Sequence, residues 1–277
     1  MHRSKTLSKN SRPCLVLAII NYSVMPRIIC SSIRNVQWAA AMPEPLALAC
    51  AVPVWRIDIA GNLHLLDKCS AVLTGDEQQR ANKYHHQKDQ HRFILARGIL
   101  RFLLALYSGQ QAADIRFTIG GNKKPVMVQS GPGEIHYNVS HAGNMILIAF
   151  GNSPVGIDVA NIDPSFDYAG ILHDCFSDEE AVYIQLSPDP MRTFFQLWSR
   201  KEALLKATGK GIDDDLKLVP CVDGFHRAPA AVAGCETDMM VDSFDVGDSY
   251  VGSSAVKDGA EEIVFVDSDI FLRNLPG

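Results

Sequence analysis

The chain has 277 residues, of which 47% are hydrophobic and 21% charged, and its formal net charge is −5. This composition is typical of a globular protein with one large or two smaller domains, and it excludes a largely disordered chain. Residues 1–43 hold six Lys/Arg and no acid, which leaves 20 basic against 31 acidic residues in the rest. A body with that balance is a poor non-specific binder of nucleic acid.

The cysteine pattern points to neither a metal site nor a disulfide framework. The seven cysteines are scattered, without a Cys-x-x-Cys pair or a Cys/His cluster. We therefore expect a reducing compartment, the cytoplasm. The longest apolar run near the start, residues 14–20, is too short to cross a bilayer, so no membrane association is expected.

The first fifty residues differ from the remainder of the chain. They are basic, free of acids before Glu44, and interrupted by four prolines. An organelle transit segment and a secretory signal are both conceivable. We favour a poorly ordered N-terminal extension over residues 1–50, because regular strand alternation begins only at residues 52–60.

Two long helices are predicted further along. Thr74 and Glu77 form a capping-box pattern, and apolar residues recur at helical spacing from Asp89 to Tyr107, before Gly109. A new helix is expected to start at Asp178, and another spans residues 191–211 with Gly209 near its end. Strands are predicted at 115–120, 144–151 and 153–160, and the apolar segments at 216–222, 229–234, 249–256 and 262–266 suggest a strand-rich end.

The two long helices share a weak internal repeat. Residues 91–109 and 191–209 each contain an arginine, an apolar stretch and a closing glycine in the same register. Two related α+β halves of about a hundred residues would fit the usual domain size. Chance similarity between two amphipathic helices explains the repeat equally well.

A Ser-His pair stands between a strand-like segment and a turn. Ser140 and His141 follow Tyr137-Asn138-Val139 and precede Gly143. Both side chains can bind phosphate oxygens, and the histidine could be charged near neutral pH. The simpler interpretation, which the segment alone favours, is a turn in which Asn138 and Ser140 satisfy backbone groups.

Asp158 is a solitary acid in the apolar run "VGIDVA". A buried carboxylate requires a cation or hydrogen-bond donors. Mg²⁺ bound to a phosphorylated substrate would serve, because Mg²⁺ usually takes one or two carboxylates together with substrate oxygens and water. A salt bridge to an arginine or a helix cap is the more common arrangement.

Trp198, Glu202 and Lys206 are four residues apart and form one stripe on a predicted helix. A surface Glu–Lys pair worth about 0.2–0.5 kcal/mol is the ordinary interpretation. However, a tryptophan usually faces packed structure, and an acid and a lysine beside it would suit a metal-and-phosphate site.

Five segments in this order resemble the 4′-phosphopantetheinyl transferases of the larger, monomeric, surfactin-synthetase-activating type. The resemblance runs from about Val52 to Gly211 and more loosely to the C-terminus. It implies an α+β fold in which two similar α/β halves, 51–152 and 153–277, form a pseudo-dimer with the active site in the cleft between them. The segments are "KYHHQKDQHRFILAR", "NKKPVM", "YNVSHAG", "VGIDVA" and "FFQLWSRKEALLKATGKGI".

The resemblance also implies which residues bind coenzyme A, the co-substrate of that family. Arg80 and Arg92 would contact its 3′-phosphate end, and Lys124 and Pro125 would lie along the adenine. The partner would be an acyl or peptidyl carrier protein of fatty-acid, polyketide or peptide synthesis. The carrier's serine would attack the β-phosphate, so that phosphopantetheine is transferred and 3′,5′-ADP leaves.

The remaining roles are implied in the same way. Ser140 and His141 would hold phosphate oxygens, Asp158 and Glu202 would bind Mg²⁺, and Lys206 would reach the pyrophosphate. In this assignment Asp158, Glu202 and Lys206 are catalytic, and Glu202 could also accept the serine proton.

The sequence departs from the family pattern next to Asp158. Many relatives carry a second acid two residues later, where this chain has Ala160, and strand alternation would place both on one side. The family's serine after the histidine is also absent, replaced by Ala142. Asp163 is a conceivable substitute, although its spacing is wrong for the same face. The alternative to an active transferase is therefore a catalytically weak coenzyme A or carrier-protein binding module.

Overall fold

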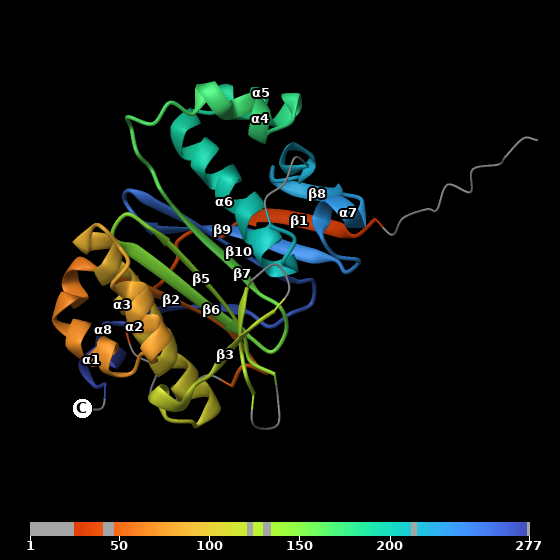
Figure 1. Ribbon diagram of the computed structural model, residues 1–277. Coiled ribbons are helices and arrows are strands. Elements are labelled where there is room, and N and C mark those ends of the chain that lie inside the picture. The colour runs from red at the N-terminus through yellow and green to blue at the C-terminus, as the bar shows by residue number, and fades with distance from the viewer. Residues whose placement is uncertain (1–24, 41–46, 121–123, 130–133, 212–214, 276–277) are drawn as a thin grey trace, which may run out of the picture.

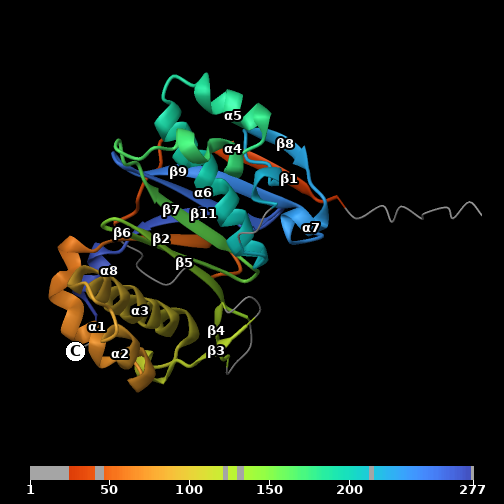
Figure 2. The same cartoon turned by 45° about the horizontal axis from the view of Figure 1, so that its top comes forward.

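The computed structural model describes residues 25–40, 47–120, 124–129, 134–211 and 215–275. They form an α+β fold with two similar halves, as expected (Figures 1 and 2). Each half starts with a strand, continues through short helices to one long helix, and later forms an antiparallel hairpin. In both halves the second hairpin strand pairs with the first strand of that half.

In the first half, the elements are β2 (Val52–Asp58), α1 (Leu66–Ala71), α2 (Gly75–Ala81), α3 (Gln87–Ser108), β3 (Phe117–Ile119), β4 (Pro125–Met127), β5 (His136–Ala142) and β6 (Met145–Gly151). In the second half, they are β7 (Gly156–Asn161), α4 (Leu172–Cys175), α5 (Asp178–Gln185), α6 (Pro190–Thr208), β8 (Gly224–Arg227), α7 (Ala230–Ala233), β9 (Met239–Gly247) and β10 (Tyr250–Lys257). Near the two ends of the chain lie β1 (Arg27–Ser32), β11 (Ile263–Asp267) and α8 (Asp269–Arg273).

The sequence signals for the two long helices are confirmed. Gly109 follows α3 with φ 71° and Gly209 follows α6 with φ 72°, a left-handed conformation that glycine adopts without a steric penalty. At its other end, α6 begins after Asp189, whose side chain accepts a hydrogen bond from the backbone N–H of Arg192 (3.0 Å).

An equivalent ion pair in each half shows that the internal repeat of the sequence is also present in the structure. The capping box at Thr74 is present, and its Glu77 also reaches the buried Arg101 of α3 at 2.8 Å. The second half repeats the arrangement, with the capping-box residue Glu180 2.7 Å from the buried Lys201 of α6. Arg101 and Lys201 occupy the same position of the sequence repeat. Chance similarity does not account for this correspondence.

Three hydrophobic clusters lie between the layers of helices and sheets. One joins α3 to the sheet β11-β2-β6-β5, and a second joins α6 to the sheet β7-β10-β9-β1-β8. The third lies between the sheets and includes Val54, Ile157 and Val159. Because side chains alternate along a strand, Asp158 and Ala160 point to the other face of β7, beneath α6.

The N-terminal extension expected over residues 1–50 is wrong for the described part of that segment. β1 pairs in parallel with β9 and antiparallel with β8, inside the sheet of the second half. Its alternate residues Ile28 and Cys30 are 0% and 2% exposed, so burial of one face holds the strand in place. Residues 1–24 and 41–46 lie outside the described residues.

The sheet of the first half also takes a strand from the far end of the chain. β11 pairs in parallel with β2, and α8 follows it. Each sheet thus contains one strand from outside its own stretch of sequence.

Two of the expected C-terminal strands are wrong. The segment 229–234 contains the helix α7, and 216–222 contains a 3₁₀ turn at Leu216–Leu218. A short apolar run cannot be assigned by periodicity, and the alanines of α7 favour a helix. The strands expected at 249–256 and 262–266 are confirmed as β10 and β11. Among the described residues, no helix combines the length and apolarity that a membrane span requires.

Candidate active site

The edge strands of the two sheets, β5 and β7, meet along a seam that side chains hold together. Asn138 Oδ1 accepts a hydrogen bond from Ile157 N (3.1 Å), and Ser140 Oγ accepts one from Val159 N (3.2 Å). These bonds fix the register of β5 against β7. As a result, Ser140 of the first half lies beside Asp158 of the second.

Helix α6 lies directly on β7 at Gly156. A Cβ atom on this glycine would be 1.9 Å from the carbonyl oxygen of Ala203, so a side chain there would force the helix away from the strand. This close approach explains the glycine before Ile157 in the sequence. It also brings Glu202 and Lys206, the residues that immediately precede Ala203 and Ala207 at this contact, over Asp158.

Four polar side chains converge at this point. Lys206 Nζ donates to Asp158 Oδ1 at 2.5 Å and to Ser140 Oγ at 3.1 Å, and it lies 3.9 Å from Glu202 Oε2. Asp158 is 6% exposed. The two carboxylates that the family resemblance assigned to a metal therefore both lie near one cation, the ammonium of Lys206.

The Ser140 hydroxyl is fully used within this cluster. Its proton goes to Asp158 Oδ1 (2.8 Å), and its lone pairs accept from Val159 N and Lys206 Nζ. Ser140 thus orients both the acid and the lysine. To donate to a phosphate oxygen as well, its proton would have to turn away from Asp158.

The donor set of the cluster fits Mg²⁺. Burial raises the pKa of Glu202, and the nearby Asp158 raises it further, while Lys206 acts in the opposite direction. A carboxyl group in that position gains from a nearby cation. Within the described ranges, no three His, Cys, Asp or Glu side chains are grouped to hold a metal. Two carboxylates with neutral oxygens and water nevertheless suit Mg²⁺, which keeps several waters.

The cluster lies in a cavity of about 510 Å³. Trp198, Glu202 and Lys206, the stripe expected on α6, all line it. Ala160 lines it too, on the same side as Asp158, so the position of the family's second acid faces the site. Phe166 also lines the cavity and, with Trp198, gives it an aromatic wall that the sequence did not reveal.

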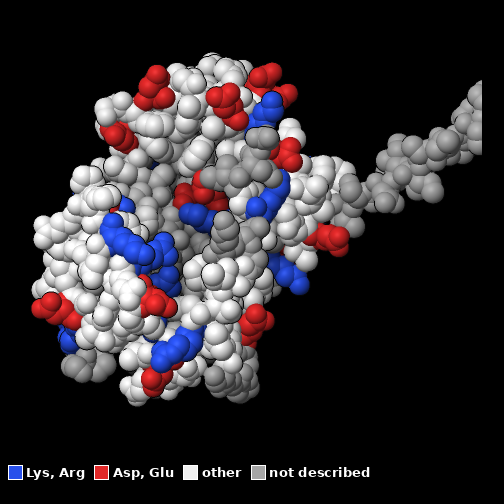
Figure 3. Space-filling model, viewed as in Figure 1, with Lys and Arg blue, Asp and Glu red and all other residues white. Residues whose placement is uncertain are grey.

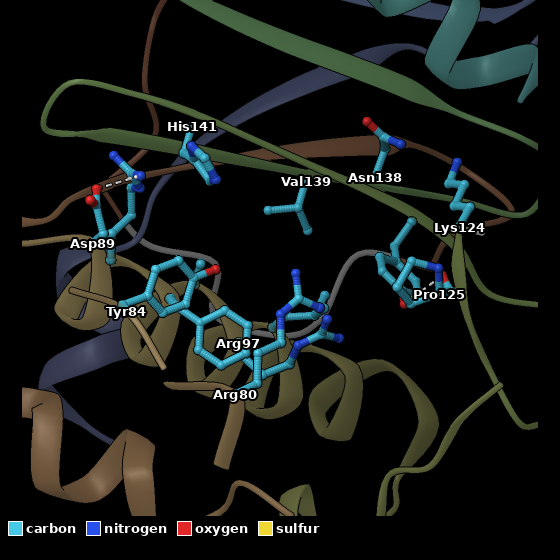
Figure 4. A pocket seen from close by; sticks show the side chains of 14 residues that line it. Arg80, Tyr84, Asp89, Arg97, Lys124, Pro125, Asn138, Val139 and His141 are labelled. Atoms are coloured by element: carbon cyan, nitrogen blue, oxygen red, sulfur yellow. Dashed lines mark hydrogen bonds and ion pairs between the residues drawn. The ribbon is translucent and has the colours of Figure 1, made fainter. Parts of the chain in front are cut away.

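A second cavity, of about 320 Å³, adjoins the first on the side of the first half. The four residues that the resemblance assigns to the 3′-phosphate end and the adenine of coenzyme A line it: Arg80 of α2, Arg92 of α3, Lys124, and Pro125 at the start of β4. Figure 4 labels Arg80, Lys124 and Pro125 around this cavity. Arg97 of α3 also lines this cavity and was missed, although it stands on the same helical face as Arg92 and Phe93.

Val139 and His141 line both cavities and so mark the passage between them. Figure 4 shows these two β5 side chains across the cavity from Arg80 and Arg97. Burial and the neighbouring charge of Arg92 lower the pKa of His141 below its ordinary value of 6.5. The lowered pKa favours the neutral ring near neutral pH, where the sequence left a charged imidazole open.

Lys124, in the second cavity, has a pKa well below the ordinary value of a lysine. Its ammonium donates to the backbone oxygen of Lys206 at 3.1 Å. Burial and the nearby Lys206 charge lower its pKa to about 8. On the surface, basic side chains gather along α2 and α3, beside a hollow with acidic and basic groups at its floor (Figure 3). A locally positive wall on an acidic body favours a ligand that carries several negative charges.

These features define a class of protein: two α+β halves, with paired carboxylates and a lysine at their seam and an adjoining basic cavity that suits a phosphorylated ligand. Comparison with known families agrees. Residues 154–252 match the 4′-phosphopantetheinyl transferase superfamily, and residues 63–152 match the 4′-phosphopantetheinyl transferase N-terminal family.

Individual relatives carry the same name. The 4′-phosphopantetheinyl transferase HetI of Nostoc is 32% identical over 182 residues, which cover 63% of this chain and 76% of HetI. The Bacillus pumilus enzyme psf-1 is 32% identical over 166 residues (58% and 69%), and ffp of Bacillus subtilis is 25% identical over 213 residues (74% and 92%). The chain therefore belongs to the 4′-phosphopantetheinyl transferase family, in the larger type to which Sfp of Bacillus subtilis belongs. The family predicted from the sequence is confirmed.

Proposed function

We propose that the protein transfers the 4′-phosphopantetheine group of coenzyme A to a serine of an acyl or peptidyl carrier protein, with Mg²⁺, and releases 3′,5′-ADP. The observation that carries the proposal is the convergence of Asp158, Glu202 and Lys206 on one cation position at the seam, next to a basic cavity. Family membership supplies the reaction type.

In this proposal the two adjoining cavities hold different parts of coenzyme A. Arg80 and Arg92 supply positive charge for the 3′-phosphate, and Lys124 and Pro125 lie along the adenine. His141 stands at the passage toward the pyrophosphate, where its neutral ring can donate one hydrogen bond. The phosphates then reach Lys206, and the pantetheine arm continues along the aromatic wall.

The residues act by positioning and charge neutralisation. The serine oxygen forms a bond to the β-phosphorus as the bond from that phosphorus to the bridging oxygen breaks, so no covalent link to the protein is needed. Lys206 neutralises charge on the departing 3′,5′-ADP. Glu202 takes the serine proton directly or through a water. Asp158 and Glu202 would hold Mg²⁺, which would neutralise the charge of the pyrophosphate.

A mass measurement tests the proposed function. The protein is incubated with coenzyme A, Mg²⁺ and a panel of apo-carrier proteins, and each carrier should gain the mass of phosphopantetheine. The competing function is a catalytically weak coenzyme A or carrier-protein binding module, which Ala160 motivates. Calorimetric binding of coenzyme A without modification of any acyl or peptidyl carrier would favour that module.

Restoring an acid at position 160 should lower the Mg²⁺ requirement. Ala160 faces the cavity beside Asp158, so the Ala160→Glu side chain has room to add a third carboxylate. We expect the Mg²⁺ concentration for half-maximal transfer to fall about tenfold. Ala160→Gln, with the same length and no charge, is the control. An unchanged Mg²⁺ titration for Ala160→Glu would show that the position does not face the metal.

Lys124 should impose an alkaline limit on coenzyme A capture. Its ammonium is charged below a pKa of about 8 and neutral above it, so attraction for the anionic substrate is lost as the pH rises through that value. We expect kcat/KM for coenzyme A, which reports the free enzyme, to decline above about pH 8. Lys124→Arg, charged throughout, should remove the decline. The same alkaline decline in Lys124→Arg would assign it to another group.

We further propose that the enzyme is a monomer of a reducing, cytoplasmic compartment. Its described cysteines are all free. We also propose 51–152 and 153–277 as the two functional halves. The second half completes the sheet of the first with β11, and β1, which precedes both halves, completes the sheet of the second.

A further inference from the structure

A row of polar side chains crosses the sheet of the second half. In the ladder, Asp158 of β7 lies opposite Ser253 of β10, and Ser253 lies opposite Ser243 of β9. Ser243 in turn pairs with Ser32 of β1. The row therefore starts at a proposed metal ligand and ends on the N-terminal strand.

Helix α6 places polar side chains over this row. It crosses the same face of the sheet (Figures 1 and 2). Because residues three, four and seven apart share one helical face, a single stripe of α6 can follow the row from strand to strand. The contacts are Lys206 to Asp158 (2.5 Å), Ser199 to Ser253 (2.6 Å), Arg200 to Ser243 (2.7 Å) and Gln196 to Ser32 (3.0 Å).

Arg200 of α6 donates to two acceptors on β1, Ser31 O and Ser32 Oγ. The residue is 1% exposed, and all three guanidinium nitrogens have acceptors. A buried guanidinium is tolerated only when its donors are satisfied, so its position depends on these groups. Besides Ser243, the acceptors are Cys221 O (2.7 Å), Asp223 Oδ1 (2.6 Å), Ser31 O (2.7 Å) and Ser32 Oγ (2.9 Å).

We propose that Arg200 is a positioning residue that couples docking of β1 to the placement of Glu202 and Lys206. The inference rests on the proposed function of that site. Arg200 precedes Glu202 by two residues on one continuous helix, so rotation or lifting of α6 at Arg200 displaces both functional side chains. Where β1 is docked, Arg200 fixes the helix, and the carboxylate and lysine face Asp158.

The first half supplies a matched control. Arg101 of α3 is also fully buried, and it bonds Glu77 and the carbonyl oxygens of Ala112 and Ile115. These partners all belong to the first half, and Arg101 lines neither cavity. Loss of Arg101 should therefore reduce stability without moving α6.

The test compares Arg200→Met with Arg101→Met, below their unfolding temperatures. Hydrogen exchange of metal-free protein follows the amides of Trp198–Lys206, and transfer is titrated with Mg²⁺. For Arg200→Met we expect faster exchange in that segment and about a tenfold higher Mg²⁺ concentration for half-maximal rate. Arg200→Lys, which keeps a donor to β1, should recover part of both effects. Arg101→Met should lower Tm and change neither readout.

Ser32→Ala provides a milder variant. Ser32 is exposed, so this protein should fold even where Arg200→Met does not, and it should shift both readouts in the same direction. If Arg200→Met folds and its α6 amides exchange at the wild-type rate, the proposal is overturned. If Arg200→Met does not fold, a wild-type exchange rate in Ser32→Ala overturns it. Absence of transfer by the wild-type protein would instead refute the proposed function, and the exchange measurement would still decide on the coupling.

Discussion

Replacing Asp158 by asparagine is expected to reduce phosphopantetheine transfer about 10³-fold, the upper range for loss of one electrostatic group in an active site. The substitution preserves shape and removes the negative charge that pairs with Lys206 at 2.5 Å. It also removes one of the two proposed metal carboxylates. The measurement is the initial rate of carrier modification at saturating Mg²⁺ and coenzyme A.

Glu202→Gln should show a loss of similar size, since it removes the second carboxylate and the proposed base together. The control is Asp245→Asn, an exposed acid on β9 of the same sheet that pairs with Arg192 on α6. That variant should keep the wild-type rate. If Asp158→Asn also modified carriers at the wild-type rate, the metal assignment would be refuted.

The composition of the site could be predicted from sequence, but its connections could not. Asp158 stood out because strand alternation placed one acid in an apolar run, and Lys206 because it shared a helical stripe with Trp198 and Glu202. The bond between Asp158 and Lys206 depends on how closely α6 approaches β7 at Gly156. It depends equally on the register that Asn138 fixes at the seam. Neither the closeness of the helix to the strand nor the register of the two strands leaves a periodic signal in the sequence.

The same limit applies to the residues that were missed. β9 was not predicted because two adjacent buried polar residues, Asp242 and Ser243, one on each face of the strand, interrupt the apolar pattern. Those polar residues are satisfied by partners on β1 and α6, both distant in sequence. A row of buried polar residues that crosses several strands therefore removes the apolar alternation by which those strands would be predicted. β1 was overlooked for a related reason: its partner strand is more than two hundred residues away.

The segment after β1 extends its role to the other sheet. Trp38 packs against Phe244 of β9 at 6.2 Å and Phe265 of β11 at 5.1 Å between ring centroids. Ala39 then exchanges backbone hydrogen bonds with the β11 region, through Phe265 O and Asp267 N. The described residues 25–40 thus contact both sheets.

Deleting residues 1–40 should therefore abolish the native fold of the second half. β1 lies between β9 and β8, so its loss exposes the β9 edge and leaves β8 without its strand partner. The buried side chain of Ile28 accounts for about 1.5–3 kcal/mol, and Arg200, which loses its acceptors on Ser31 and Ser32 but keeps Asp223, costs about 1–3 kcal/mol. Together these approach the 5–15 kcal/mol by which such domains are stable.

The expected result is a protein without a cooperative thermal transition or protected amides in β9, measured by circular dichroism and hydrogen exchange. Deletion of residues 1–24 alone, which keeps every described contact of β1, is the matched control and should melt as the full chain does. Ile28→Ala in the full chain should be destabilised by about 2–5 kcal/mol and still fold. A single cooperative melt within a few degrees of the full chain after removal of residues 1–40 would show that β1 is an accessory strand, and it would remove the basis for coupling through Arg200.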